Sequence, residues 1–139
     1  MNTQRHQTGS SLVESMIAIV ILSFGVLGLA RFQVNMLAQS TDALSRLAAT
    51  AQAEELLAMV RIDVLNAHCY TVPADGACGS TFAALQAQAW STTAAKSIPG
   101  ISSFAASMPD ANTFQVALAW NSKAFKETRS LQVSTDVRP

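Results

Sequence analysis

Charge is scarce in this chain of 139 residues, and it is evenly balanced. Lys and Arg together number 9, Asp and Glu together number 9, and the formal net charge is +0. Nucleic acids and anionic membranes are recognised by dense basic patches, and no block of like charge occurs here. The slight basic excess formed by Lys123, Lys126, Arg129 and Arg138 is interpreted as the solvated end of a hairpin, so no nucleic-acid partner is expected.

Histidine is nearly absent, which removes the commonest general base. The two histidines are His6 and His68, and neither provides a credible base for a Ser, Cys or Thr nucleophile. Glu54 and Glu55 are adjacent, and adjacent helical positions do not face each other. The sequence therefore predicts a protein that is not an enzyme and has no cofactor.

Proline is missing before Pro73, and charge is missing from Ser15 to Ala30. An apolar helix needs about 20 residues to cross a bilayer core, and Ser10 to Ala30 supplies them when Glu14 is included. An ionised acid inside a membrane is costly when unpaired, so such a residue is by default a functional-site hypothesis. We therefore single out Glu14.

The spacing between Gly9 and Glu14 is the next informative feature of the sequence. Gly9 ends a short polar leader, and Glu14 is the fifth residue after it. This arrangement resembles the class III signal of type IV pilins and pseudopilins. The segment from Phe24 to Gln33 reads FGVLGLARFQ and is similar to the Gly-x-Leu-Gly-Leu-Ala-x-x-Gln segment of PilV-type minor pilins, the type IV pilus modification proteins.

The resemblance implies how the chain is processed. A prepilin peptidase would cut between Gly9 and Ser10, and the new Ser10 amine would be a site of N-methylation. The family usually has Phe or another large apolar residue at the first mature position, whereas this chain has Ser10. Cleavage is expected to tolerate that difference, and methylation is left open.

The resemblance also implies a function, partners and a location. The chain would be a minor pilin that belongs to the priming or tip complex of a type IV pilus and supports twitching motility and adhesion. Its partners would be other minor pilins, the major pilin, the prepilin peptidase and the inner-membrane assembly platform. Before assembly it would lie in the inner membrane with a periplasmic head, and afterwards in the pilus on the cell surface.

The amine made by cleavage offers Glu14 a partner. An α-amino group has an unperturbed pKa of about 7.7 to 8.0 and is mostly cationic at neutral pH. In a water-poor filament core, Glu14 would pair with the Ser10 amine of its own chain or of a neighbour.

Two alternatives stay open. A type II secretion pseudopilin would have a closely similar amino terminus. From a different class, cleavage after Ala30 at an ordinary secretory site would release a disulfide-stapled binding module that begins at Arg31.

The expected organisation is a leader at 1–9, a transmembrane and assembly helix at 10–31, an amphipathic half of the same helix at 32–66, and a periplasmic head at 67–139. One helix is expected from about Ser11 to about Asn66. A recurring set of apolar residues predicts the face of its second half that packs on the head. This set comprises Leu37, Leu44, Leu47, Ala48, Ala51, Leu57, Ala58 and Val64.

Cys69 and Cys78 bracket a turn-rich segment that contains Pro73 and Asp75-Gly76. In the periplasmic compartment that the resemblance implies, a disulfide between them is the default expectation. A metal site is the weaker alternative, because His68 adds only a third ligand and structural zinc takes four.

The rest of the head predicts a short helix, a loop and a hairpin. The helix would run from Ser80 as its cap to about Ala95, with Phe82, Leu85, Ala89 and Trp90 on its apolar side. Ile101 to Asn112 is expected to be a loop, and two alternating segments around Trp120 and Leu131 are expected to pair as antiparallel strands. The expected fold class is α+β and pilin-like, with a long amino-terminal helix packed on a small antiparallel sheet.

Overall fold

A computed structural model describes residues 10–122 and 126–138, with side chains from residue 12 onward. Along the chain the elements are α1 (Ser10–Ile62), a 3-10 helix η1 (Val64–Tyr70), α2 (Thr81–Ser97) and three strands, β1 (Ile101–Asp110), β2 (Thr113–Ser122) and β3 (Glu127–Asp136). The long amino-terminal helix followed by a small antiparallel sheet confirms the predicted pilin-like α+β class. The chain divides into two compact units, Met1–Leu37 and Ala38–Pro139.

The first unit contributes only the amino-terminal part of α1. Every described side chain from Leu12 to Leu37 is exposed within the chain, including large apolar ones such as Phe24 at 72%. A helix that is apolar on all sides is suited to a membrane or to burial among other proteins.

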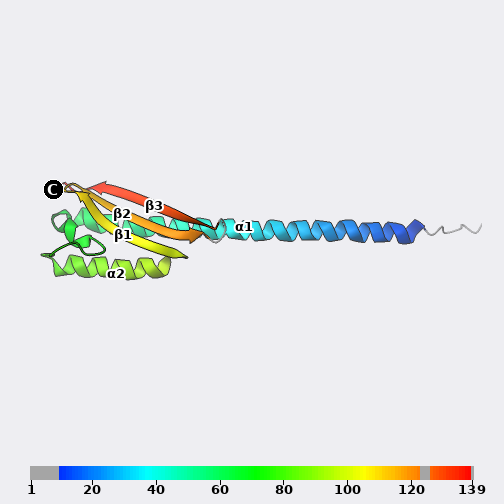
Figure 1. Ribbon diagram of the computed structural model, residues 1–139, viewed down its shortest axis with the longest axis horizontal. Coiled ribbons are helices and arrows are strands. Elements are labelled where there is room, and N and C mark those ends of the chain that lie inside the picture. Colours follow the sequence, from blue (N-terminus) through cyan, green and yellow to red (C-terminus); the bar gives the residue numbers. More distant parts are fainter. Residues whose placement is uncertain (1–9, 123–125, 139) are drawn as a thin grey trace, which may run out of the picture. The chain divides into compact units, whose positions relative to one another are not determined.

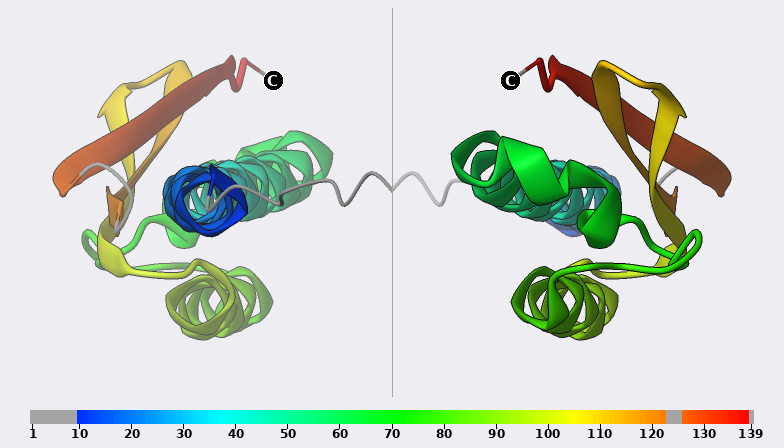
Figure 2. Two further views of the ribbon diagram at one scale, coloured as in Figure 1. Left: turned by 90° about the vertical axis from the view of Figure 1, so that its right-hand side faces the viewer. Right: turned by 90° about the vertical axis from the view of Figure 1, so that its left-hand side faces the viewer.

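The second unit is a two-layer arrangement of helices on one face of a sheet. The head part of α1 lies beside α2, and the sheet lies against both helices (Figures 1 and 2). Two contacts document this packing. The indole Nε1 of Trp90 donates to the carbonyl oxygen of Gln52 at 2.8 Å, which joins α2 to α1. Arg61 Nε donates to Thr135 Oγ1 at 3.0 Å, which joins α1 to β3.

The sheet has the order β1-β2-β3, with both pairs antiparallel. In β2 the residues Phe114, Val116, Leu118 and Trp120 alternate with less buried neighbours and are all buried. Leu118 pairs with Leu131 of β3 and with Phe104 of β1. The predicted β2–β3 hairpin is thus confirmed, because period-two alternation directs one face of each strand into the core.

The expectation of a loop at Ile101 to Asn112 is wrong, because most of this segment forms β1. Its burial follows no clean alternation, and small residues such as Ser102 and Ala105 dominate it. Tertiary pairing overrides these weak local propensities. Ten residues of β1 lie beside β2, and register shifts near both ends of the pairing disturb the pattern.

The predicted end of the long helix is four residues too late. Helix α1 ends at Ile62, and Asp63 has a non-helical backbone with φ −119° and ψ 53°. The Asp63 carboxylate accepts a hydrogen bond from Asn66 Nδ2 at 2.8 Å. Asp and Asn side chains that bond locally in this way compete with helical geometry, and Asn66 itself is non-helical within η1.

The predicted packing face of α1 is right only in part. Leu57 is buried, and Ala48 and Val64 are partly buried against the core, whereas Leu44 and Leu47 are 60% and 67% exposed. The buried apolar face consists of Ala49, Ala53, Leu56, Leu57 and Val60, and of these only Leu57 belongs to the predicted set. The predicted set therefore mixes residues that pack on the head with exposed residues from the other side of the helix, such as Leu44 and Leu47.

The predicted apolar side of helix α2 is right for Trp90, which is buried, and wrong for Phe82, Leu85 and Ala89, which are exposed. Ser80 caps the helix, as expected, by accepting from the Ala83 amide at 3.3 Å. Phe82 and Leu85 are exposed at 65% and 64%, however, and the buried face is formed by Ala83, Ala87, Trp90 and Ala94. The buried face of α2 thus consists of small side chains and the single large residue Trp90, which reaches α1 through its hydrogen bond to the Gln52 carbonyl oxygen.

Candidate functional site

The candidate site is the amino-terminal part of α1, around Glu14. Between Leu12 and Ala30, Glu14 is the one charged residue, and Arg31 is the next. Gly9, where cleavage is expected, lies outside the described residues. Ser10 begins α1.

The described part of α1 includes a stretch that is long and apolar enough to cross a membrane, and none of that stretch is buried within the chain. Its polar side chains are suited to such surroundings. Ser23 donates its hydroxyl hydrogen to the carbonyl oxygen of Ile19 at 2.7 Å. A hydroxyl bonded to its own helix in this way does not need a water partner. Glu14 is the exception in this stretch, because a carboxylate is costly to place in a lipid environment without a partner.

Two glycines lie farther along this helix, at positions 25 and 28. An added Cβ atom at either position would meet no atom of the described residues within 4 Å, apart from its own stretch of helix. Packing within the described part of the chain therefore does not require glycine there. Small residues in membrane helices allow the backbone of another helix to approach closely.

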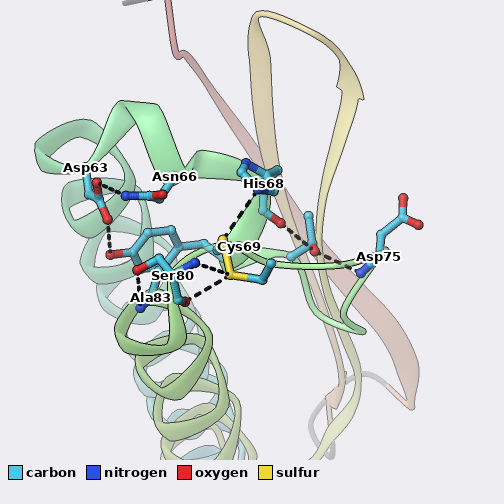
Figure 3. Close-up of a disulfide and its surroundings, with 10 residues drawn as sticks. Asp63, Asn66, His68, Cys69, Asp75, Ser80 and Ala83 are labelled. Atoms are coloured by element: carbon cyan, nitrogen blue, oxygen red, sulfur yellow. Dashed lines mark hydrogen bonds between the residues drawn. A yellow bond between two sulfur atoms is a disulfide. The ribbon is translucent and has the colours of Figure 1, made fainter.

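The second predicted feature, the disulfide, is present in the structure. Cys69 and Cys78 are joined, with their Cα atoms 5.1 Å apart and a sequence separation of 9 (Figure 3). On the chain-entropy model, closing a loop of this length contributes about 2.5 to 3 kcal/mol to stability. Cys69 is buried, so the bridge is anchored in the core of the second unit.

The loop that the disulfide closes is tied to the sheet. Val72 and Ala106 of β1 exchange two backbone hydrogen bonds of 2.8 Å. The Thr71 hydroxyl donates to the His68 carbonyl oxygen at 3.0 Å and accepts from the Asp75 amide at 3.1 Å. The loop thereby covers part of the outer edge of β1, an edge that would otherwise be open to pairing with another chain.

Tyr70, which follows the disulfide residue Cys69 in the chain, forms a polar contact with Asp63. The Tyr70 hydroxyl donates to Asp63 Oδ2 at 3.4 Å. Burial raises the pKa of the Tyr70 phenol above its usual value of 10.0, and the negative charge and the hydrogen bond of Asp63 raise it further. This contact fixes the turn between α1 and the disulfide loop.

Metal ligation is not indicated by the described residues: residues 10–122 and 126–138 contain no group of three or more His, Cys, Asp or Glu side chains placed to hold an ion. His68 Nε2 lies 3.5 Å from Cys69 Sγ, but that sulfur belongs to the disulfide. The candidate functional features are therefore the carboxylate of Glu14, the exposed apolar part of α1 and the second unit with its Cys69–Cys78 disulfide.

Sequence reasoning missed one feature, the placement of Arg129. It was grouped with the solvated hairpin end, but its side chain is only 33% exposed and lies in a cleft with Arg46 and Trp120. The signal was available, because Arg129 shares the period-two face of Leu131 and Val133. Of the other residues in that group, Arg138 pairs with Asp136, which lowers the pKa of the Asp136 carboxyl, chiefly through their hydrogen bond.

Comparison with known proteins bears on the amino terminus. A family model described as the prokaryotic N-terminal methylation motif matches residues 4–30. The chain therefore carries a prepilin signal of the type IV pilin kind, which includes Gly9, Ser10 and Glu14. Neither a search of curated proteins nor a search of solved structures found a match.

Proposed function

We propose that the chain is a non-enzymatic minor pilin of the PilV type, which enters a type IV pilus or its priming complex through its amino-terminal helix. In this proposal a prepilin peptidase cuts between Gly9 and Ser10. The head stands in the periplasm while the helix is held in the inner membrane, and the subunit then moves into the pilus on the cell surface. The observation that carries the proposal is the methylation motif at residues 4–30, which includes an apolar helical stretch whose described side chains are all exposed within the chain.

An exposed apolar face of α1 supports assembly over simple membrane anchoring. We call this face the outer stripe and define it as Leu44, Leu47, Ala51, Ala58 and Ile62. These residues recur at spacings of three, four and seven, so they share one side of the helix. All five are exposed, with Leu47 at 67% and Ile62 at 89%. They belong to the second unit, and exposed apolar side chains gathered on one side of a helix are typical of a surface that associates with another protein.

Glu14 is the residue that we assign to assembly. In a filament core, its carboxylate would pair with a Ser10 amine of the same or a neighbouring subunit, and removing one partner would strand the other charge. The resemblance to PilV-type proteins adds other minor pilins and the major pilin as partners, and adds support of motility and adhesion.

The test is incorporation of Glu14 variants into filaments sheared from cells. We expect Glu14→Ala to be processed normally at Gly9 and to fall at least about tenfold in sheared filaments, because the lost pairing exceeds about 1.4 kcal/mol. Glu14→Asp, which keeps the charge, is the matched control and should be incorporated better than the alanine variant. Normal amounts of Glu14→Ala in the filaments would contradict the pairing.

The assembly in which the subunit is found distinguishes a minor pilin from a pseudopilin. Purified type IV pili that contain the subunit support the proposal. Recovery of the subunit only with a secretion apparatus would assign it to the pseudopilins and leave the processing step intact.

A further inference from the structure

The second unit contains a cleft of about 410 Å³ between α1 and the β2–β3 hairpin. Trp120 and Arg129 are direct partners across β2 and β3, so their side chains share the face of the sheet that lies against the helix. Arg46 enters from α1. The cleft is lined by Arg46, Thr50, Trp120, Thr128, Arg129, Ser130 and Leu131.

The lining carries two positive charges and no carboxylate. Acidic side chains lie at the margin of the cleft: Arg46 Nε lies 3.2 Å from Asp42 Oδ2, and Arg129 Nη2 lies 3.8 Å from Glu127 Oε2. A guanidinium has five N–H donors. Within residues 10–122 and 126–138, the terminal nitrogens of Arg46 make no hydrogen bond, so its donors facing the cleft remain available.

Trp120 adds a donor that the chain does not use. Its indole Nε1 is buried and has no hydrogen-bond acceptor among the described residues. The side chain as a whole is 3% exposed. An unpaired buried N–H is costly, and most such groups in folded proteins find a partner. Trp120 contrasts with Trp90, whose Nε1 donates to the Gln52 carbonyl oxygen.

We propose that this cleft binds a small oxyanion, a phosphate or carboxylate group, between the guanidinium groups of Arg46 and Arg129. Arginine is the residue best matched to such groups, because its planar donors bind two oxygens at once. Because the Trp120 side chain lines the cleft, its indole N–H would lie near the negative charge of the bound anion. This inference is independent of filament assembly and of the processing of the amino terminus.

The two tryptophans provide a direct readout. The full mature chain, labelled with ¹⁵N-tryptophan in an uncharged detergent, gives one indole N–H resonance from Trp90 and one from Trp120. We expect titration with inorganic phosphate to move the Trp120 resonance with saturation while the Trp90 resonance stays in place. Sodium chloride at matched ionic strength should not reproduce the movement, because screening alone is not saturable at one site.

Variants assign the movement to the cleft. Arg46→Gln and Arg129→Gln should each weaken phosphate binding about tenfold or more, since each removes charge-assisted hydrogen bonds. Arg61→Gln is the matched control: Arg61 also joins α1 to β3, through Thr135, but does not line the cleft. It should bind as the parent does.

Acetate in place of phosphate shows which geometry the cleft prefers, and saturable binding of either anion supports the site. Three results would overturn the proposal. They are a Trp120 resonance that no oxyanion moves, a movement that chloride reproduces, and equal weakening by Arg61→Gln and Arg129→Gln.

Discussion

The indole Nε1 of Trp90 donates to the backbone carbonyl oxygen of Gln52 over 2.8 Å, and this bond fastens α2 to the head part of α1. The same ring meets Phe104 of β1 edge-on, with centroids 6.2 Å apart. Trp90 therefore touches both layers of the second unit, at the point where the small residues of α1 and α2 leave room for one large side chain.

The two tryptophans should differ in what they contribute to stability. Trp90→Phe removes a satisfied buried hydrogen bond, whereas Trp120→Phe removes an N–H without an acceptor among the described residues. Both changes lose similar apolar area. We expect Trp90→Phe to cost about 1 to 3 kcal/mol more than Trp120→Phe, measured by urea unfolding of the mature chain in uncharged detergent. Equal costs, or a larger cost at Trp120, would show that the Gln52 bond contributes little.

Tyr70 should make the fold sensitive to alkaline pH. Burial raises the pKa of its phenol above 10.0, with Asp63 adding to the shift. The unfolded chain would then lose the phenolic proton at a lower pH than the folded chain. Stability is therefore complete below the ordinary tyrosine pKa and falls as the pH rises from there toward the folded pKa.

Ultraviolet titration of the phenolate measures this shift directly, because Tyr70 is the single tyrosine of the chain. Asp63→Asn should lower the Tyr70 pKa only part of the way back, since burial is the largest cause of the shift. A Tyr70 that titrates at its ordinary value in the folded protein would refute the prediction.

The outer stripe should serve assembly and not folding. Leu44→Asp and Leu47→Asp change exposed positions, so each should alter the free energy of unfolding by no more than about 0.5 kcal/mol. If the stripe contacts another subunit, both variants should be depleted from sheared filaments, because a buried unpaired carboxylate is costly.

The matched control for the stripe is Leu85→Asp. Leu85 is 64% exposed, close to the values for Leu44 and Leu47, but it lies on α2. It should be incorporated as the parent is. If all three variants enter filaments equally well, the stripe is not an assembly surface.

How far the sequence predicts the structure depends on how regular each local pattern is. The hairpin of β2 and β3 follows from strict alternation around Leu118 and Leu131, and the cap of α2 follows from Ser80. The disulfide was expected once a periplasmic head was implied, and the structure has it. These features are local, and each rests on one kind of residue at a fixed spacing.

The predictions that fail concern which apolar residues of α1 and α2 are buried, and whether residues 101–110 form a strand. Leu47 and Phe82 look like core residues by hydrophobicity but are exposed, whereas the small residues Ala53 and Ala87 are buried. A search for large apolar residues therefore finds Leu57 and Trp90, which are buried, together with exposed residues from the other side of each helix. Strand β1 was missed for a related reason, because its small polar residues carry no period and its pairing with β2 is decided by tertiary contacts.

The most direct test of the account is the mass of the amino-terminal peptide of the protein isolated from cells that contain a prepilin peptidase. The account predicts a chain that begins at Ser10, with or without one methyl group, and that keeps Met1 when the peptidase is removed. Cleavage after Ala30 would give a chain about 2 kDa lighter, beginning at Arg31. A start at Arg31 would mean that the apolar helix and Glu14 are discarded, and it would contradict the proposed function.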